Sequence, residues 1–485
     1  MSEAEIFYVT LFALPLLAGI LIYLALFFKI RIPHQYMLSV MTVLHLALVM
    51  SIWSRPFPET HWFRLDEVSL LFLTILSFAF FAVALFSIDF LRQFDRGSQT
   101  RVFVANLCFS LLCGSVALTS NHLGLTWVFI EGTTLTLVTA IGYYRQEDSL
   151  EGAWKYLFIC SVGIALAFVG ILLLALAIAG KMELQDAMFY TRLQHIAPQL
   201  PTFWLKISFT FLFVGYSTKI GVIPFYSADI DAKDVAPAQI GGLISSSLGL
   251  IGLFAVLKYY QVLVDDSRLF ASHLFILTGI ASVILAAAYM LRVQNYKRML
   301  AYSSMEHYGL ILICFGSGIP ATAILHVVGH SLTKLSLFFT AGFFVRKYAT
   351  KNIADLSGLC AREPVLGWLW MAGCASSIGL PPFSIFFSEF QLFHHLVLEK
   401  NWILLILLLV FMTVILKGMA GNFFSMSWGI PVKAARLPLF YYGKLTVLLQ
   451  ILCLIGVLLL GFQILVSGVF VENFLTRAGA LFSNL

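Results

Sequence analysis

Ionisable side chains interrupt four strongly apolar segments of this sequence. Glu131 lies within LTWVFIEGTTLTLV, Lys219 within FLFVGYSTKIGVIPF, and Glu389 within GLPPFSIFFSEF. The fourth segment, ILHVVGHSLTKLSLFF, carries His326, His330 and Lys334 at every fourth position. A charge at the centre of a bilayer costs about 2.5–3.5 kcal/mol on insertion scales, so such residues are functional candidates by default. The chemistry that these residue types share is proton transfer.

Glu131 and Lys219 are opposite charges in two separate apolar segments. If their side chains face each other, both stay ionised and attract by about 4 kcal/mol at an effective dielectric of about 20. Weakening the contact lets the lysine release its proton, and restoring it favours recapture. The sequence therefore predicts a proton switch at this pair, and a static ion pair that holds two helices together is the alternative.

His326, His330 and Lys334 share one face of a helix because they lie four residues apart. Histidine titrates near neutrality and exchanges its donor and acceptor nitrogens. One such residue per turn, about 5–6 Å apart, suits a proton relay through bridging waters. The alternatives are a metal site and structural histidines bonded to carbonyl groups. We predict no metal, because Lys334 would repel a cation and no nearby acid supplies a third ligand.

The other ionisable candidates have two interpretations each. Glu389 follows a double proline and is either the terminal proton donor toward the outside or a glutamate bonded to backbone amides freed at the helix break. Lys155 either tunes Glu131 or extends its ammonium to the membrane surface. Glu306 and His307 open an apolar segment and form either a proton-uptake site or a helix cap.

The composition indicates what must hold these residues. Hydrophobic residues make up 60% of the 485 positions and charged residues only 11%, against an apolar share of about 45–50% in globular domains. Backbone polar groups in lipid must pair internally, so the long apolar runs are expected to be helices, and none shows the alternation of a barrel strand. We predict an all-α polytopic membrane protein with no soluble domain.

The charge distribution indicates topology rather than nucleic-acid binding. The net charge is +6, but the basic residues lie in loops, and most of them fall on one side if both termini are outside. We therefore predict a bacterial or archaeal inner membrane protein in contact with lipids, with both termini periplasmic. The seven cysteines are scattered without C-x-x-C spacing and are predicted to be buried apolar residues.

Fourteen membrane spans are predicted, and two of them contain helix breakers. Gly221 and Pro224 interrupt the seventh span, and Pro381 and Pro382 interrupt the twelfth. A short tail follows the last span, either as an interfacial helix or as disordered chain. The predicted spans cover residues 6–28, 36–53, 67–91, 102–120, 122–144, 152–180, 203–227, 236–263, 269–291, 301–317, 320–345, 364–398, 402–426 and 441–467.

The two broken spans are five apart, and this odd offset reverses their orientation. Broken helices in corresponding places predict two inverted five-helix repeats with a transport site at the breaks. The match is imperfect, because Pro224 follows Lys219 whereas Pro381 and Pro382 precede Glu389. The predicted division is a three-helix segment (1–100), a first repeat (101–263), a second repeat (264–426), and a last span with its tail (427–485).

Several segments resemble a known family. GYSTKIGVIPF, NYKRMLAYSSMEHYGL, HVVGHSLTKLSLFFTAG, DLSGL and GLPPFSIFFSEF look like the antiporter-like subunits of respiratory complex I, Mrp antiporters and group 4 energy-converting hydrogenases. LEGAWKYLFICSVGIAL most resembles the hydrogenase-four F type. The resemblance implies a fold of fourteen helices. By the same resemblance, buried proton-channel residues match Glu131, Lys219, Lys334 and Glu389, and central histidines match His326 and His330.

The sequence departs from this family in three places. After Lys219 the family usually reads H-T-W-L-P-D-A-H, whereas this chain reads YSADIDAK. A linking lysine or histidine is replaced by Leu250, so Ser245, Ser246 and Ser247 or water would have to connect the two halves. A long lateral helix that some members append is not found in this sequence. These departures put a two-halved pump and its usual partners in doubt.

The leading hypothesis is a proton-conducting subunit with no cofactor and no redox or hydrolytic site of its own. Its expected partners are other membrane-arm subunits and a soluble nickel–iron hydrogenase or quinone oxidoreductase module, with no nucleic acid. The alternative is the membrane subunit of a DAB-type inorganic-carbon accumulation system, whose partner is a zinc protein resembling carbonic anhydrase. A non-conducting scaffold is a third possibility, which Leu250 favours and the retained ionisable residues oppose.

Overall fold

The computed structural model describes residues 2–30, 32–428 and 443–466. Within these ranges the chain is helical, apart from turns and four isolated β-bridges. The predicted all-α membrane class is confirmed, and eleven of the described helices are long and apolar enough to cross a membrane. The count of fourteen spans and the inverted repeat remain predictions. The tail beyond the last span lies outside the described residues.

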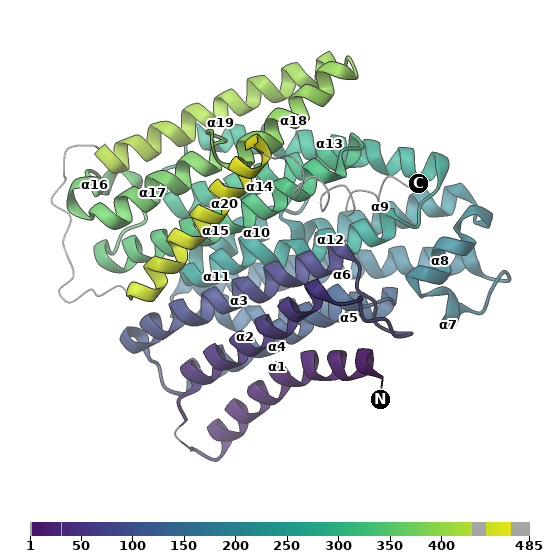
Figure 1. Ribbon diagram of the computed structural model, residues 1–485, viewed down its shortest axis with the longest axis horizontal. Helices are drawn as coiled ribbons and strands as arrows, with labels where there is room; N and C mark the ends of the chain where they lie inside the picture. Colours follow the sequence, from purple (N-terminus) through teal and green to yellow (C-terminus); the bar gives the residue numbers. More distant parts are fainter. Residues whose placement is uncertain (1, 31, 429–442, 467–485) are drawn as a thin grey trace. The chain divides into compact units, whose positions relative to one another are not determined.

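The chain divides into two compact units, of which the first ends at Ala271 and the second begins at Ser272. The four predicted sequence segments remain a prediction. Figure 1 shows the helices in chain order, from purple to yellow. The first unit contains α1 (Glu3–Phe27), α2 (His34–Met50), α3 (Glu67–Phe94), α4 (Ser98–Thr119), α5 (Leu123–Ile141), α6 (Glu147–Ile178), α7 (Leu184–Ala187), α8 (Tyr190–Ile196), α9 (Thr202–Ile220), α10 (Ser227–Val235), α11 (Ala238–Leu243), a π-helix (Ile244–Leu248), α12 (Gly249–Tyr260) and the start of α13 (Asp265–Met290).

The second unit contains the rest of α13 and the helices that follow it. Its centre is α15, which packs against α14, α17, α18 and α20. The yellow α20 crosses in front of α15 in Figure 1. The helices are α14 (Tyr296–Gly316), α15 (Pro320–Tyr348), α16 (Leu359–Arg362), α17 (Pro364–Ser377), α18 (Ser384–Leu398), α19 (Trp402–Trp428) and α20 (Lys444–Val466).

Both predicted helix breaks are present. α9 ends at Ile220, Gly221 adopts a left-handed φ of 80°, and α10 begins only at Ser227. α17 ends at Ser377, Gly379 has a φ of 65°, and α18 begins at Ser384. A positive φ suits glycine because it has no Cβ to clash with the backbone. Each break therefore ends one helix with a glycine and starts a new helix beyond the prolines.

Glycines also let helices in each unit approach closely. A Cβ at Gly215 of α9 would lie 2.5 Å from the carbonyl oxygen of Gly163 on α6, and a Cβ at Gly279 of α13 would lie 2.5 Å from that of Gly309 on α14. Lipid offers no hydrophobic drive for helix association, so close backbone packing of small residues does this work in membranes. These contacts hold α9 against α6 in the first unit and α14 against α13 in the second.

Candidate functional site

The first unit buries Lys219 at the C-terminal end of α9. Only 6% of this residue is exposed. Its Nζ lies 3.4 Å from the Thr133 hydroxyl on α5 and 3.3 Å from the Tyr156 hydroxyl on α6, and 5.1 Å from the centre of the Tyr156 ring. An ammonium in such a place needs polar or π-electron partners to offset its lost hydration. Lys219 obtains both from Thr133 and Tyr156.

Glu131 lies on α5 and is only partly buried. Its carboxylate accepts hydrogen bonds from Thr134 at 2.9 Å and Ser161 at 2.7 Å. Within the described residues no ion pair joins Glu131 to Lys219, so the expected direct contact is absent. The two charges are instead hydrogen-bonded to two neighbouring hydroxyls, Lys219 to Thr133 and Glu131 to Thr134. The charges therefore interact electrostatically across hydroxyl groups rather than by contact.

A second charged pair lies just beyond the break of α9. Asp229 and Lys233 on α10 form an ion pair of 2.5 Å, and their side chains are only 3% and 1% exposed. The Asp229 carboxylate packs against Gly221, where a Cβ would come within 2.5 Å of it. From the sequence, this segment was noted only as a departure from the pattern of the family that the chain resembles. The overlooked signal was an acid and a base at i and i+4, the spacing of helical neighbours.

Lys155 lies at the exposed edge of the same region. Its ammonium pairs with Glu151 at 2.6 Å and with Asp231 of α10 at 3.7 Å, and its side chain is 47% exposed. The structure gives it no hydrogen bond or ion pair with Glu131, so Lys155 connects α6 to α10. This position agrees with the interpretation of an ammonium extended to the surface.

The predicted linking residues lie on and just after a π-helix. Ser245, Ser246 and Ser247 fall within Ile244–Leu248, and Leu250 follows on α12. All four are buried. One turn of π-helix inside a longer helix is rare and often marks a functional position. Beyond it, α12 packs so closely on α9 that a Cβ at Gly252 would lie 2.7 Å from the Cβ of Lys219.

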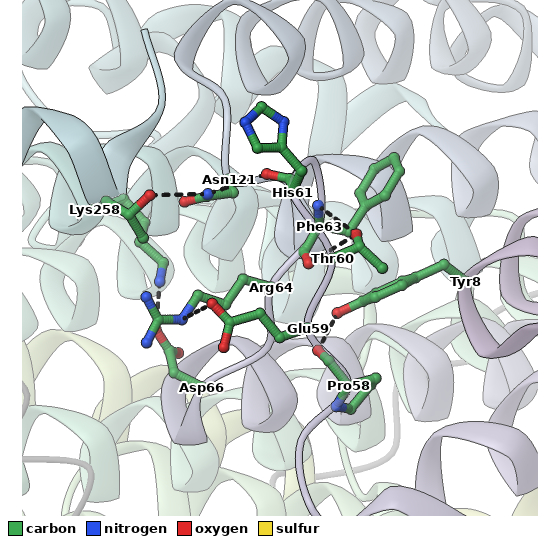
Figure 2. Close-up of polar contacts among 11 residues, drawn as sticks. Tyr8, Pro58, Glu59, Thr60, His61, Phe63, Arg64, Asp66, Asn121 and Lys258 are labelled. Atoms are coloured by element: carbon green, nitrogen blue, oxygen red, sulfur yellow. Dashed lines mark hydrogen bonds and ion pairs between the residues drawn. The ribbon is translucent and has the colours of Figure 1, made fainter. Parts of the chain in front are cut away.

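A polar hollow of about 480 Å³ lies near the loops that precede α3, α5 and α9. Its lining includes Glu59, His61, Arg64, Arg192 and His195. Figure 2 shows the loop before α3, where the Nε of Arg64 lies 3.5 Å from a carboxylate oxygen of Glu59. Lys219, at the C-terminal end of α9, is not among the residues that line the hollow. No pattern in the sequence indicated these lining residues.

Asp66 and Lys258 form an ion pair beside this hollow (Figure 2). Asp66 also caps α3 by accepting hydrogen bonds from the Ser69 amide at 2.8 Å and the Ser69 hydroxyl at 2.7 Å. Burial raises the pKa of the Asp66 carboxyl, but Lys258 and Ser69 outweigh burial and hold that pKa below its usual range. The pair thus fixes the start of α3 to the end of α12.

In the second unit a continuous hydrogen-bonded chain joins a serine to a buried lysine. The Nδ1 of His326 lies 2.9 Å from the Ser388 hydroxyl, and its Nε2 lies 2.9 Å from the Nδ1 of His307. The Nε2 of His307 lies 3.3 Å from the Ser377 hydroxyl. All these residues are buried. The chain therefore crosses from α18 through α15 and α14 to α17 without a break.

Lys334 ends this chain. Its Nζ lies 2.7 Å from the Ser303 hydroxyl and 3.4 Å from the Ser377 hydroxyl, and these two hydroxyls are 3.1 Å apart. The hydrogen bonds that join His326 to Lys334 therefore pass through His307 of α14 and two serines, and the proton relay along one face of α15 remains a prediction. We call the hydrogen-bonded series the imidazole chain; in order, its members are Ser388, His326, His307, Ser377, Ser303 and Lys334.

His307 is thus a central member of the chain and not a cap, because α14 is capped by Asn295. His330 lies beside the chain, with its ring centre 5.0 Å from that of His307 and 5.1 Å from that of Tyr308. The prediction that His330 stands between His326 and Lys334 in a relay remains untested. Its ring packs against the bridging histidine.

Both acids that the sequence singled out in the second unit are buried. Glu306 is 4% exposed, and its Oε2 has no hydrogen-bond partner among the described residues. Glu389 is 8% exposed and packs its carboxyl against Gly379 at the helix break. The two acids interact electrostatically. Across the described ranges, no group of three or more histidine, cysteine, aspartate or glutamate side chains is placed to hold a metal ion.

Comparisons with known proteins agree with the resemblance seen in the sequence. A family model described as NADH:quinone oxidoreductase/Mrp antiporter, transmembrane, matches residues 120–416. The hydrogenase-4 component F homolog of Methylacidiphilum infernorum is 37% identical over 343 residues, which cover 69% of this chain and 72% of that protein. NADH-quinone oxidoreductase subunit M of Rickettsia typhi is 28% identical over 334 residues, covering 67% of this chain and 64% of the relative.

Hydrogenase-4 component B of Escherichia coli is 24% identical over 345 residues, and the match spans 67% of this chain but only 49% of that longer protein. Two solved structures share the fold. A chain of an archaeal membrane-bound sulfane sulfur reductase has a TM-score of 0.86 at 20% identity, covering 98% of this chain and 97% of its own. A chain of respiratory complex I from Thermus thermophilus has a TM-score of 0.76 at 19% identity, covering 95% and 98%.

Proposed function

Because this multi-pass membrane protein belongs to the NADH:quinone oxidoreductase/Mrp antiporter transmembrane family, we propose that it translocates protons within a multisubunit membrane complex. The observation that carries the proposal is the imidazole chain, which joins buried hydroxyls and imidazoles to Lys334 with no gap. Hydroxyls and imidazoles both donate and accept hydrogen bonds, as a proton carrier must.

Hydrogen-bond valence orients the chain. The Ser388 hydroxyl donates to the carbonyl oxygen of Ile385 at 2.8 Å, so it accepts from the Nδ1–H of His326. A neutral His326 then accepts at Nε2 from the Nδ1–H of His307, whose own Nε2 accepts from Ser377. With Lys334 charged, every donor therefore points away from the lysine and toward Ser388.

This polarity describes one half of a transfer cycle. A proton leaves Lys334 toward the serines, Ser377 passes its own proton to the Nε2 of His307, and His307 passes its Nδ1 proton to the Nε2 of His326. Lys334 is then neutral, His326 is an imidazolium, and His307 carries its proton on Nε2 instead of Nδ1, so one positive charge has moved along the chain. Return of the proton resets the chain. Release of the proton from His326 leaves every donor reversed, and the hydroxyls and imidazoles must reorient before the next transfer.

In the first unit, Lys219 is the corresponding proton carrier. The ammonium of Lys219 donates hydrogen bonds to the Thr133 and Tyr156 hydroxyls. Glu131, which accepts hydrogen bonds from Thr134 and Ser161, supplies a nearby negative charge. A charge that interacts through hydroxyls responds to small helix movements, because the Coulomb energy changes with distance and with local water. Conduction in either unit requires no cofactor in this chain.

The partners remain part of the proposal. The relatives are named as components of hydrogenase-4 and of NADH-quinone oxidoreductase, so we propose that this chain joins other membrane subunits and a soluble catalytic module. Purification of the intact complex identifies that module. A hydrogenase or quinone-reducing module supports the proposal, whereas a zinc protein resembling carbonic anhydrase would assign the chain to inorganic-carbon uptake.

Proton flux in vesicles tests the conduction itself. The purified complex is reconstituted into liposomes loaded with a pH-sensitive dye, and proton uptake is measured under an imposed membrane potential. Lys334→Met should lower the flux by about 100-fold, because it removes the terminal proton carrier. Lys417→Met, at an exposed lysine of α19, is the matched control and should retain it. Equal flux in both variants, with intact assembly, would refute proton transfer through Lys334.

A further inference from the structure

We propose that Asp229 and Lys233 form a proton-exchange pair for Lys219, distinct from Glu131. The inference rests on the proposed proton translocation and assigns a role to α10, which follows the break after α9. Asp229 takes the proton that Lys219 releases, and the charge of Lys233 keeps that binding of the proton transient. The segment Tyr226–Lys233 is also where this sequence departs from the pattern of the family that it resembles.

The position of Asp229 carries the first step of the argument. Gly221 lies two residues beyond Lys219, and the Asp229 carboxylate occupies the space where a side chain at Gly221 would lie. The helix break thus folds α10 back so that an acid reaches the end of α9. Lys219 interacts electrostatically with Asp229 as well as with Glu131. Two carboxylates on different helices therefore act on one lysine.

Tyr156 provides a connection between these groups. Its hydroxyl lies 3.3 Å from the Nζ of Lys219, and its phenol interacts electrostatically with both Asp229 and Glu131. A phenol hydroxyl both donates and accepts a hydrogen bond. It can therefore accept a proton from Lys219 while it passes its own proton toward a carboxylate, directly or through water.

The step balances without any other reactant. An N–H bond of the Lys219 ammonium breaks, and an O–H bond forms on the Asp229 carboxylate. Lys219 and Asp229 both become neutral, while Lys233 remains an ammonium. The net charge of the three groups is +1 before and after the transfer. After the transfer this charge lies on Lys233, whose buried ammonium has lost its anion and therefore favours rapid release of the proton from Asp229.

Stability alone does not explain why the pair is buried. Taking two charges out of water costs several kcal/mol, and replacing a buried ion pair by apolar residues is often neutral or stabilising. The side chains of Asp229 and Lys233 are only 3% and 1% exposed, so they bear this cost in full. A pair that exchanges protons with Lys219 gains a function from the same burial.

Proton flux in the reconstituted complex tests the inference. Asp229→Asn should lower the flux by about tenfold, because the amide has nearly the same shape but cannot take a proton. Asp229→Glu, which restores the acid, should recover most of the loss. Asp231→Asn is the matched control, because Asp231 lies on the same helix but pairs with the half-exposed Lys155. Its flux should stay close to that of the unmodified protein.

A double variant separates proton exchange from a structural role. Asp229→Asn leaves Lys233 buried without its anion, which by itself harms folding. Asp229→Asn combined with Lys233→Met removes both charges and relieves that harm. The double variant should assemble normally and still lack flux. Recovery of flux in the double variant would overturn the inference, because a structural pair is dispensable once both charges are gone.

The outcomes also distinguish this inference from the proposed function. If the unmodified complex carries no proton flux, the proposed function itself fails. A second outcome is that the unmodified complex conducts protons and Lys219→Ala does not. If Asp229→Asn then conducts as well as Asp231→Asn, only the role of Asp229 fails. Low flux in Asp229→Asn and in the double variant, with recovery in Asp229→Glu, supports both.

Discussion

Lys219 in the first unit and Lys334 in the second unit are both buried, but their neighbours differ in kind. Lys219 in the first unit interacts electrostatically with two carboxylates, Glu131 and Asp229. Lys334 in the second unit interacts electrostatically with one carboxylate, Glu306, and also contacts serines that lead to two imidazoles. Opposite charges change how firmly a lysine holds its proton, whereas imidazoles carry a proton onward. Under the proposed function, the first unit therefore controls proton release, and the second also supplies a path for the released proton.

The largest loss of proton flux is expected when the imidazole of His307, which bridges two residues of the second unit, is removed. His307→Phe fills the same space but interrupts the imidazole chain between His326 and Ser377. Proton flux should fall by about 100-fold in reconstituted vesicles, because a ring without nitrogen neither donates nor accepts a proton. His394→Phe, at an exposed position of α18, is the control. Unchanged flux in His307→Phe would mean that protons bypass the chain.

A smaller loss is expected from the first unit when Glu131 becomes uncharged. Glu131→Gln keeps one acceptor oxygen for one of the Thr134 and Ser161 hydroxyls, and its amide NH2 donates to the other, so the fold should be retained. Lys219 loses one of its two negative neighbours, and flux should fall by about tenfold. The measurement is flux per assembled complex. A fully active Glu131→Gln protein would show that Glu131 is structural and that the two units do not differ in the way described.

Crowding the lysine without altering any charge gives a weaker effect. Gly252→Ala places a methyl group 2.7 Å from the Cβ of Lys219, so α12 or α9 must shift. Overpacking of this kind costs about 1–3 kcal/mol, and we expect flux to fall severalfold while assembly is preserved. Gly421→Ala is the control, because a Cβ there meets nothing within 4 Å. Identical behaviour of the two variants would show that the position of Lys219 is not critical.

The smallest effect is expected at the ion pair of Asp66 and Lys258, which should affect stability rather than proton flux. In this respect it should differ from the pair of Asp229 and Lys233. Asp66→Asn removes the charge that caps α3 and pairs with Lys258, and it should destabilise the protein by about 1 kcal/mol near neutral pH. The pKa of Asp66 is lower in the folded state, so this stabilisation is fully present above the unfolded pKa and is lost as pH falls through the folded pKa.

Thermal unfolding in detergent at several pH values checks this expectation. The difference between Asp66→Asn and the unmodified protein should be largest near pH 7 and should vanish in strong acid. Proton flux near neutral pH should change little. A large loss of flux with unchanged stability would contradict a purely structural role and would draw the ion pair at the end of α12 into the conduction pathway.

Local patterns predicted the fold class and the places of the helix breaks. Length and apolarity predict a membrane helix, and proline with a nearby glycine favours a break in it, so Gly221, Pro224, Pro381 and Pro382 were informative without any knowledge of packing. The buried charges were also visible, because a charge in an apolar run is unusual whatever surrounds it. These features depend only on neighbours in the sequence.

Contacts between helices were not predictable in the same way. His307 of α14 bridges His326 of α15 and Ser377 of α17, and no spacing within one segment encodes this meeting of three helices. Lys219 and Glu131 were expected to touch from the sequence, but each is hydrogen-bonded to a different hydroxyl, Thr133 or Thr134. Asp229 was missed because a polar segment after a proline is typical of a loop, and only the folded chain returns it to Lys219.

The glycines at the two breaks carry a consequence for sequence variation. At Gly221 and at Gly379, a carboxylate from the next helix occupies the volume of the missing side chain. Each glycine and its acid, Asp229 or Glu389, therefore share one space and cannot change independently. Among related sequences, a larger residue at either glycine should occur together with a shorter or absent acid. Loss of the acid should in turn free the glycine to vary.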